Sequence, residues 1–457
     1  MKKSVRLKTV VGVGVVALVS LCVVCVVGGS PVGMAGMTPE LWQEDLQYLA
    51  KALPARHGNA YNQVSQEDFE AAVQELGQSI AELDDHQVAV EMGRLVAMIG
   101  DGHTELWLPQ SATGFGRLPL ALYYYGDDLY VFAATGPATE AIGSRVVAID
   151  GVPVSEAYDR VVPLIARDNV FEYLRSAPMY LVVPEILHAV GVAGDPAKAV
   201  FTLDGPDGVY DLEVGAGVNL AQATWTTAVD SAGAATPLFF RHQDSYYWYE
   251  YLKDERALYL KYNKCRDQPG RESIKRFARD LFEFVDQTDV QKFVIDLRHN
   301  TGGNFHRNQP LLDGILERPE LNRPGHLFVL TSRTTFSAAT IAAIDFKRKT
   351  AALIVGEPSR GRPNGYSDEK HLRLPNSGIE VNYAPIYREA MPELGDAPYL
   401  PVDISVDRSF EDYRSGRDPI LETVLAWKAG EALTVTRTTD AETPVGSGKT
   451  RGVSGSL

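Results

Sequence analysis

Cysteine is scarce in this chain of 457 residues, which contains three. Cys22 and Cys25 lie in an apolar stretch near the N-terminus, so Cys265 has no partner for an internal disulfide and cannot belong to a cysteine-rich metal site. The segment Asn263-Lys264-Cys265-Arg266 shows no catalytic context, and we expect a buried thiol there rather than a nucleophile. The nine histidines show no paired spacing typical of zinc sites, so neither a metal nor a cofactor is predicted.

The chain also lacks the excess of positive charge that nucleic-acid-binding proteins carry. Its 44 lysines and arginines are outnumbered by 59 aspartates and glutamates, which gives a formal net charge of −15. This balance disfavours nucleic acids and anionic membrane surfaces as partners. Hydrophobic residues make up 45% of the chain, which is enough for two or three compact units with cores of their own.

An export signal is predicted at the N-terminus. Four basic residues among the first eight precede an apolar run over residues 9–29. Gly33-Met34-Ala35 offers small residues for signal cleavage, but the run is also long enough to remain as a single membrane anchor. We therefore interpret residues 1–35 as a signal peptide or membrane anchor, and expect a secreted or extracytoplasmic protein of the periplasm or cell envelope.

The hydrophobic period divides the remaining chain into three parts and a tail. Residues 38–105 repeat apolar residues every three or four positions, which predicts a helical N-terminal subdomain. Residues 117–218 change to a period of two, which predicts mainly strands and turns, among them a hairpin around Asp150-Gly151. Residues 240–430 alternate between strands and helices, which is typical of an α/β core, and residues 431–457 are predicted to be a disordered tail.

Two loops of the α/β part carry residue types suited to catalysis. The segment from Asp296 to Gly303 follows an apolar strand, and its glycine pair lets backbone N–H groups face a ligand, although a tight turn would also use glycines. Ser337 stands at the start of an alanine-rich helix, where a developing negative charge is favoured. Serine is also a common N-cap, so neither loop alone specifies catalysis.

These two loops and a third motif together carry a family resemblance. Asp296-Leu-Arg-x-Asn-x-Gly-Gly303, Phe336-Ser337-Ala-Ala and Gly356-Glu357-Pro358 resemble, in order and spacing, the core of the C-terminal-processing (tail-specific) serine peptidases. The resemblance implies an α/β chain, α+β overall, with a crotonase-like (ClpP/crotonase) catalytic core. It also implies a helical N-terminal subdomain and a β-rich PDZ-like segment.

The resemblance further assigns the nucleophile and its base. Ser337 corresponds to the family's nucleophilic serine, but Arg362 stands where tail-specific members place a catalytic lysine, and arginine keeps its proton at physiological pH. The segment from Asp101 to Thr104 resembles the Asp-Gly-His-Thr motif of the tricorn-like and retinoid-binding-like branch. His103 is therefore expected to be the general base.

The remaining catalytic groups are also inferred from the resemblance. An acidic residue downstream of the serine should orient the imidazole; Asp396 fits best and Glu393 is the alternative, while Asp101 is a further possible orienting group. The oxyanion is expected to be held by backbone N–H groups of Ala338 and of Gly302 or Gly303.

The expected function is that of an exported serine-type peptidase acting on peptide or protein substrates. Its PDZ-like segment would bind an extended substrate segment as an added strand. The alternative is a carrier of hydrophobic ligands without proteolysis, as in the retinoid-binding branch; the joint presence of Ser337 and His103 favours the peptidase. The export signal disfavours a crotonase-like acyl-CoA enzyme, and the oligomeric state is left open.

Overall fold

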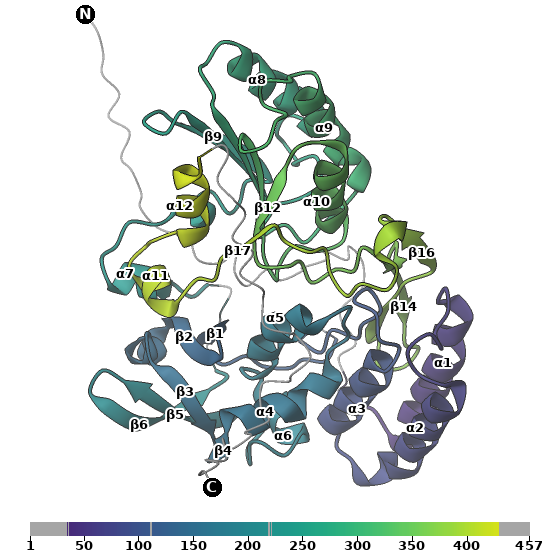
Figure 1. Cartoon of the computed structure of the whole chain (residues 1–457). Helices are drawn as coiled ribbons and strands as arrows, with labels where there is room; N and C mark the ends of the chain where they lie inside the picture. The colour runs from purple at the N-terminus through teal and green to yellow at the C-terminus, as the bar shows by residue number, and fades with distance from the viewer. Residues whose placement is uncertain (1–33, 35, 110–111, 218–219, 221, 429–457) are drawn as a thin grey trace, which may run out of the picture.

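The computed structural model describes residues 34, 36–109, 112–217, 220 and 222–428 (Figure 1). The predicted tail and the apolar run of the predicted export signal lie outside these residues. Within the described part, no helix combines the length and the apolar character that crossing a membrane requires. The chain forms a mixed α/β structure with several sheets.

The N-terminal part is helical, as its periodicity predicts. Ser65 Oγ accepts the backbone N–H of Asp68 at 3.0 Å, and Asp84 forms a capping box with Gln87, so side chains satisfy the free N–H groups of two helix starts. The apolar faces of the helices meet in one core. The helices are α1 (Pro39–Arg56), α2 (Gln66–Ser79) and α3 (Asp85–Ala97).

The second part contains a seven-stranded sheet in the order β1-β2-β3-β5-β6, with β4 beside β3 and β7 beside β2. The predicted hairpin is formed by β3 and β4, with Asp150 (φ 47°) and Gly151 (φ 77°) in the turn. The strands are β1 (Leu120–Tyr125), β2 (Asp128–Thr135), β3 (Arg145–Ile149), β4 (Val152–Pro153), β5 (Lys198–Gly205), β6 (Gly208–Gly215) and β7 (Trp225–Thr227).

Helices also occur in this second part, which was predicted to consist mainly of strands and turns. They are α4 (Val154–Val161), α5 (Val170–Tyr180) and α6 (Pro184–Ala189), all between β4 and β5. The first four residues of α6 are all buried, so this helix shows no alternation of apolar and polar faces. Because α6 is buried on several sides, its sequence lacks the apolar period that would have predicted a helix.

The third part is built on a six-stranded sheet in the order β17-β12-β11-β10-β9-β8. Only β8 runs antiparallel to its neighbour; the other strands pair in parallel. Parallel neighbours place their carboxyl ends at one edge of a sheet, where ligands commonly bind. The strands are β8 (Tyr247–Leu252), β9 (Ala257–Tyr262), β10 (Lys292–Asp296), β11 (Leu327–Thr331), β12 (Leu353–Gly356) and β17 (Ile404–Ser405).

Helices cover both faces of this sheet (Figure 1). Alternate residues of each strand face opposite sides, so Phe293 and Ile295 of β10 join one core whereas Val294 joins the other. Helices α8 (Ile274–Asp286), α9 (Gln309–Leu316) and α10 (Ala338–Lys349) cover the first face, and α12 (Pro419–Ala426) covers the second.

Two small antiparallel sheets, β13 with β16 and β14 with β15, follow β12. The β14–β15 hairpin contributes Leu372 and Val381 to the core of the N-terminal helices. In its turn, the backbone N–H groups of Asn376 and Ser377 donate to the Asp45 carboxylate at 2.8 and 2.9 Å. The strands are β13 (Asn364–Ser367), β14 (Lys370–Arg373), β15 (Glu380–Tyr383) and β16 (Ile386–Glu389).

Short elements complete the described chain. The short helices are α7 (Ala228–Ser231) and α11 (Phe410–Arg414), and the 3-10 turns are η1 (Ile80–Glu82), η2 (Gly136–Ala141), η3 (Val162–Leu164), η4 (Leu238–Phe240), η5 (Phe305–Asn308) and η6 (Pro392–Leu394).

The contact between α8 and α9 gives a test of this packing. A Cβ atom added at Gly314 would lie 1.9 Å from Phe282 Cε2. We expect Gly314→Ala to lower the stability by about 1–3 kcal/mol through overpacking, despite the better helix propensity of alanine. Urea unfolding followed by circular dichroism measures this loss.

Gly77→Ala in α2 is the matched control. Its added Cβ would make only ordinary contacts, the nearest at 3.4 Å, so we expect a gain of up to about 1 kcal/mol. Equal stability of the Gly314→Ala chain and the parent would contradict the close packing of α8 on α9.

Candidate active site

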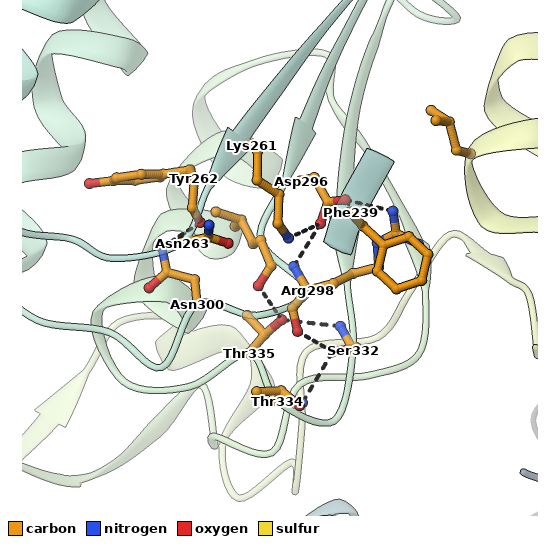
Figure 2. A network of polar contacts seen from close by, with 12 residues as sticks. Phe239, Lys261, Tyr262, Asn263, Asp296, Arg298, Asn300, Ser332, Thr334 and Thr335 are labelled. Atoms are coloured by element: carbon orange, nitrogen blue, oxygen red, sulfur yellow. Dashed lines mark hydrogen bonds and ion pairs between the residues drawn. The ribbon is translucent and has the colours of Figure 1, made fainter. Parts of the chain in front are cut away.

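A buried ion cluster ends β10 at the carboxyl edge of the six-stranded sheet (Figure 2). The Asp296 carboxylate accepts hydrogen bonds from Lys261 Nζ at 3.0 Å and Arg298 Nε at 3.0 Å. Arg298 in turn donates to both oxygens of Asp418, at 2.7 and 2.8 Å. Burial alone would raise the pKa of Asp296, but the positive charges of Arg298 and Lys261 outweigh burial and hold that pKa below its usual range.

The loop after β10 is joined to the loop after β11 by hydrogen bonds (Figure 2). Ser332 Oγ donates to the Arg298 carbonyl at 2.6 Å, and Thr335 Oγ1 donates to the Leu297 carbonyl at 3.0 Å. The Phe336 N–H donates to the carbonyl of Asn300 at 3.0 Å. These bonds hold the glycine pair against the start of α10.

Ser337 has a backbone conformation that few non-glycine residues adopt, with φ 54° and ψ −125°. It precedes α10, but its side chain makes no capping hydrogen bond. A Cβ at Gly302 would lie only 2.7 Å from Ser337 Cβ, so the glycine loop approaches the serine as closely as a residue without a side chain allows. The N-cap role that was open from the sequence is therefore not the one Ser337 has here.

The oxyanion was predicted to be held by the backbone N–H of Ala338 together with that of Gly302 or Gly303. The Gly302 N–H already donates to Asn300 Oδ1 at 2.9 Å. Ala338 is the first residue of α10, so its N–H has no acceptor within the helix. Gly303 has φ 136°, and a Cβ there would lie 2.6 Å from the Cys265 carbonyl oxygen. Ala338 and Gly303 are thus left as the candidate donors.

His103 stacks on Phe336, the residue that precedes Ser337 in the sequence. Its ring lies 4.4 Å from the Phe336 ring, centroid to centroid, at an interplanar angle of 27°. The His103 side chain is buried, yet neither Nδ1 nor Nε2 has a hydrogen-bond partner in the described part of the chain. Both ring nitrogens are therefore available for a proton transfer.

Asp101 holds the backbone of the His103 loop rather than the His103 ring. Its Oδ1 accepts the His103 N–H at 2.9 Å, and its Oδ2 lies 2.8 Å from His57 Nε2. The Asn59 N–H donates to His57 Nδ1 at 3.0 Å, so the ring proton of a neutral His57 is on Nε2 and is donated to Asp101. His57 thus anchors Asp101, whose two carboxylate oxygens are both engaged.

Asp168 is a further buried carboxylate at this loop, and the sequence analysis did not select it. Its oxygens accept the N–H groups of Gly102 at 2.8 Å and Arg362 at 3.2 Å. Burial raises the pKa of Asp168, and the nearby His103 and the two N–H donors offset this only in part. Asp168 lies in a loop of the β-rich part, 65 residues beyond His103 in the sequence, so no local motif marks it.

Neither predicted acid contacts His103 in the described part of the chain. Glu393 is exposed, and its Oε1 lies 3.3 Å from Arg348 Nε near the C-terminal end of α10, roughly 16 Å along the helix from Ser337. Asp396 is also exposed, and no contact joins its carboxylate to His103 in the part of the chain that the structure describes.

The surroundings of Cys265 and Arg362 indicate structural rather than catalytic roles. Burial raises the pKa of the Cys265 thiol to about 12, which keeps it protonated and unreactive, as the sequence predicts. The guanidinium of Arg362 donates from Nε to the Asp168 carbonyl at 2.8 Å and so holds the loop that carries Asp168.

Comparison with known proteins finds likeness at the level of structure. No protein-family model and no curated protein sequence matches the chain. The structure of mature CPAF complexed with lactacystin has a TM-score of 0.59 at 12% identity, covering 85% of this chain and 98% of that one. A second structure of mature CPAF has a TM-score of 0.58 at 12% identity, covering 85% and 96%. The chain therefore shares the fold of these structures.

The contribution of the buried ion cluster to stability can be tested at Asp296. Asp296→Asn leaves the buried cations without their shared carboxylate, and we expect a loss of about 3–5 kcal/mol in urea unfolding at neutral pH. Because the pKa of Asp296 is lower in the folded chain, its contribution is full above the unfolded pKa and is lost as the pH falls through the folded one. The difference between variant and parent should therefore shrink in acid.

Asp280→Asn is the control for removing a carboxylate. Asp280 is 44% exposed and pairs with Arg279 on the surface of α8, so we expect a change below about 1 kcal/mol. A similarly small loss for Asp296→Asn would show that the buried cluster does not hold the edge together.

Proposed function

We propose that this chain is a serine peptidase of the C-terminal-processing (tail-specific) family, in the branch that uses a Ser–His pair. The observation that carries the proposal is the stacking of His103 on Phe336, the residue before Ser337. Ser337 is strained and its side chain makes no capping hydrogen bond, and both ring nitrogens of the buried His103 lack hydrogen-bond partners in the described part of the chain. A hydrophobic-ligand carrier has no physical need for such a nucleophile and base.

The proposed reaction is an acyl transfer to Ser337 followed by hydrolysis. Ser337 Oγ attacks the peptide carbonyl carbon while His103 takes its proton, and the carbonyl oxygen becomes an oxyanion. The N–H groups of Ala338 and Gly303 hold this oxyanion at the positive end of α10. His103 then gives the proton to the departing amine, and a water molecule activated by His103 releases the acyl group.

The architecture supports the same proposal. We assign the parallel sheet, with α10 following β11, to the crotonase-like core that the motifs imply, and the sheet of β1 to β6 to the PDZ-like segment. The shared fold with CPAF extends over 85% of the chain, so both parts are included in the likeness. Peptide or protein substrates and an extracytoplasmic location belong to this proposal.

A fluorophosphonate probe, which reacts only with activated serines, tests the pair. We expect Ser337→Ala to abolish labelling, and His103→Ala to lower the labelling rate by about 10²–10⁴, because the serine loses its general base. Labelling is followed by fluorescence after gel separation, with circular dichroism to verify folding.

Two control variants remove a serine and a histidine that have no part in the proposed reaction. Ser273→Ala removes the N-cap of α8, which should cost about 1 kcal/mol of stability but leave labelling unchanged. His371→Ala removes an exposed histidine of β14 and should also leave labelling unchanged. A folded parent that is not labelled at all would reject the peptidase and favour the hydrophobic-ligand carrier.

For the acid that stabilises the imidazolium, the proposal names Asp168 ahead of Asp396 and Glu393. Asp168 is buried at the same loop as His103 and lies within electrostatic reach of its ring. Its two backbone N–H donors compensate its burial only in part, so a positive charge forming on His103 is stabilised there. Glu393 already pairs with Arg348, and Asp396 is exposed to solvent.

The acid is identified by the pH dependence of labelling. Asp168→Asn should lower the labelling rate by about tenfold or more and move the pH midpoint of labelling downward, because the imidazolium loses a neighbouring negative charge. Asp396→Asn and Glu393→Gln should leave the midpoint unchanged. A downward shift in Asp396→Asn alone would transfer the role to Asp396; a slower rate without any shift would give Asp168 a structural role only.

A further inference from the structure

A cavity lies at the same edge of the six-stranded sheet, on the side of α12. Its lining includes Ile420 of α12, whereas Ser337 begins α10 on the opposite face. The cavity volume is about 40 Å³. One water molecule needs roughly 10–15 Å³ of such space, so the cavity admits a group of the size of a carboxylate.

The cavity has aromatic walls around one arginine. Arg408 lies over five aromatic rings, with its Cζ between 4.8 and 5.9 Å from their centroids. Four of these rings line the cavity, two from β1 and two from η4. Its side chain also bonds to the hydroxyl of Tyr123, which is uncharged. The rings shield the guanidinium from water and so strengthen its attraction for an anion.

The charges around the cavity do not cancel. Arg298 takes both Asp296 and Asp418, and Arg333 pairs with Glu357. Arg408 has no carboxylate within ion-pair distance among the described residues, and its effect on Glu357 is exerted at longer range. The cavity therefore has one positive charge that the described part of the chain does not neutralise.

His299 adds a hydrogen-bonding atom without a partner. It lines the cavity beside the rings of Phe239 and Phe240, and its buried Nδ1 has no hydrogen-bond partner in the described chain. Burial and the charge of Lys261 hold the pKa of His299 well below its usual range, so its ring is neutral. A neutral imidazole with the proton on Nδ1 donates one hydrogen bond to an anion.

We propose that this cavity binds the carboxylate of a ligand that carries a small apolar group next to it. Arg408 forms the ion pair, His299 Nδ1 donates a hydrogen bond, and Tyr125 and Phe240 contact the apolar group. The same chemistry is offered by a free small carboxylate and by the C-terminus of a peptide. This site is separate from Ser337, and its existence does not depend on the proposed peptidase activity.

Calorimetric titration of the full chain carrying Ser337→Ala tests the site without turnover. The probes are N-acetylalanine and a short peptide ending in alanine, each as the free acid and as the amide. We expect one acid to bind per chain and its amide to bind at least about tenfold more weakly, because the charge-assisted contact is lost. A peptide acid that binds while N-acetylalanine does not would identify a chain terminus as the ligand.

Two variants assign the binding to the cavity. Arg408→Met should weaken binding of the acid by about tenfold or more, whereas Arg414→Met, which removes an exposed arginine of α11, should leave it unchanged. If Arg408→Met does not fold, the difference in binding between the free acid and the amide still tests the proposal. Equal binding of acid and amide, no binding of either acid, or unchanged binding by folded Arg408→Met would each overturn the proposal.

Discussion

Asp296 and Arg298 are two residues apart, and between them they tie the end of β10 to β9 through Lys261 and to the start of α12 through Asp418. Such a buried cluster is stable only when every charge keeps its partner, because an isolated charge in the interior is costly. The loop that leaves this cluster carries both the glycine pair and His299. Its position determines where the glycine pair approaches Ser337 and where the cavity of Arg408 is placed.

Three distant parts of the chain meet at His103. Asp101, engaged by His57 of the helical part, holds its backbone, Asp168 of the β-rich part holds the neighbouring Gly102, and Phe336 of the α/β core stacks on its ring. The β14–β15 hairpin reinforces this arrangement by packing into the core of the N-terminal helices. The position of His103 is therefore a property of all three parts packed together.

The two faces of this sheet edge differ in chemistry. On the α10 side, neither ring nitrogen of His103 has a hydrogen-bond partner among the described residues, and Ser337 makes no capping bond. On the α12 side, Asp418 and Glu357 each pair with an arginine, whereas Arg408 has no carboxylate within ion-pair distance among the described residues, which suits binding of an anion. Arg298 stabilises both sides, because its carbonyl accepts from Ser332 on the way to Ser337 while its guanidinium lines the cavity.

Local pattern was sufficient for the strands and helices of the core, because periodicity, caps and short motifs are encoded by neighbouring residues. Short motifs also singled out Ser337 and His103, whose catalytic roles stay a proposal. It was not sufficient for α6, whose buried surface has no period, nor for Asp168 and Arg408. Those two residues matter through partners that are far away in the sequence, such as Gly102 for Asp168 and Phe239 for Arg408. Glu393 fitted a downstream acid by spacing alone, yet packing places it beside Arg348. Contacts between distant segments depend on how the sheets and helices pack, and only the tertiary structure decided them.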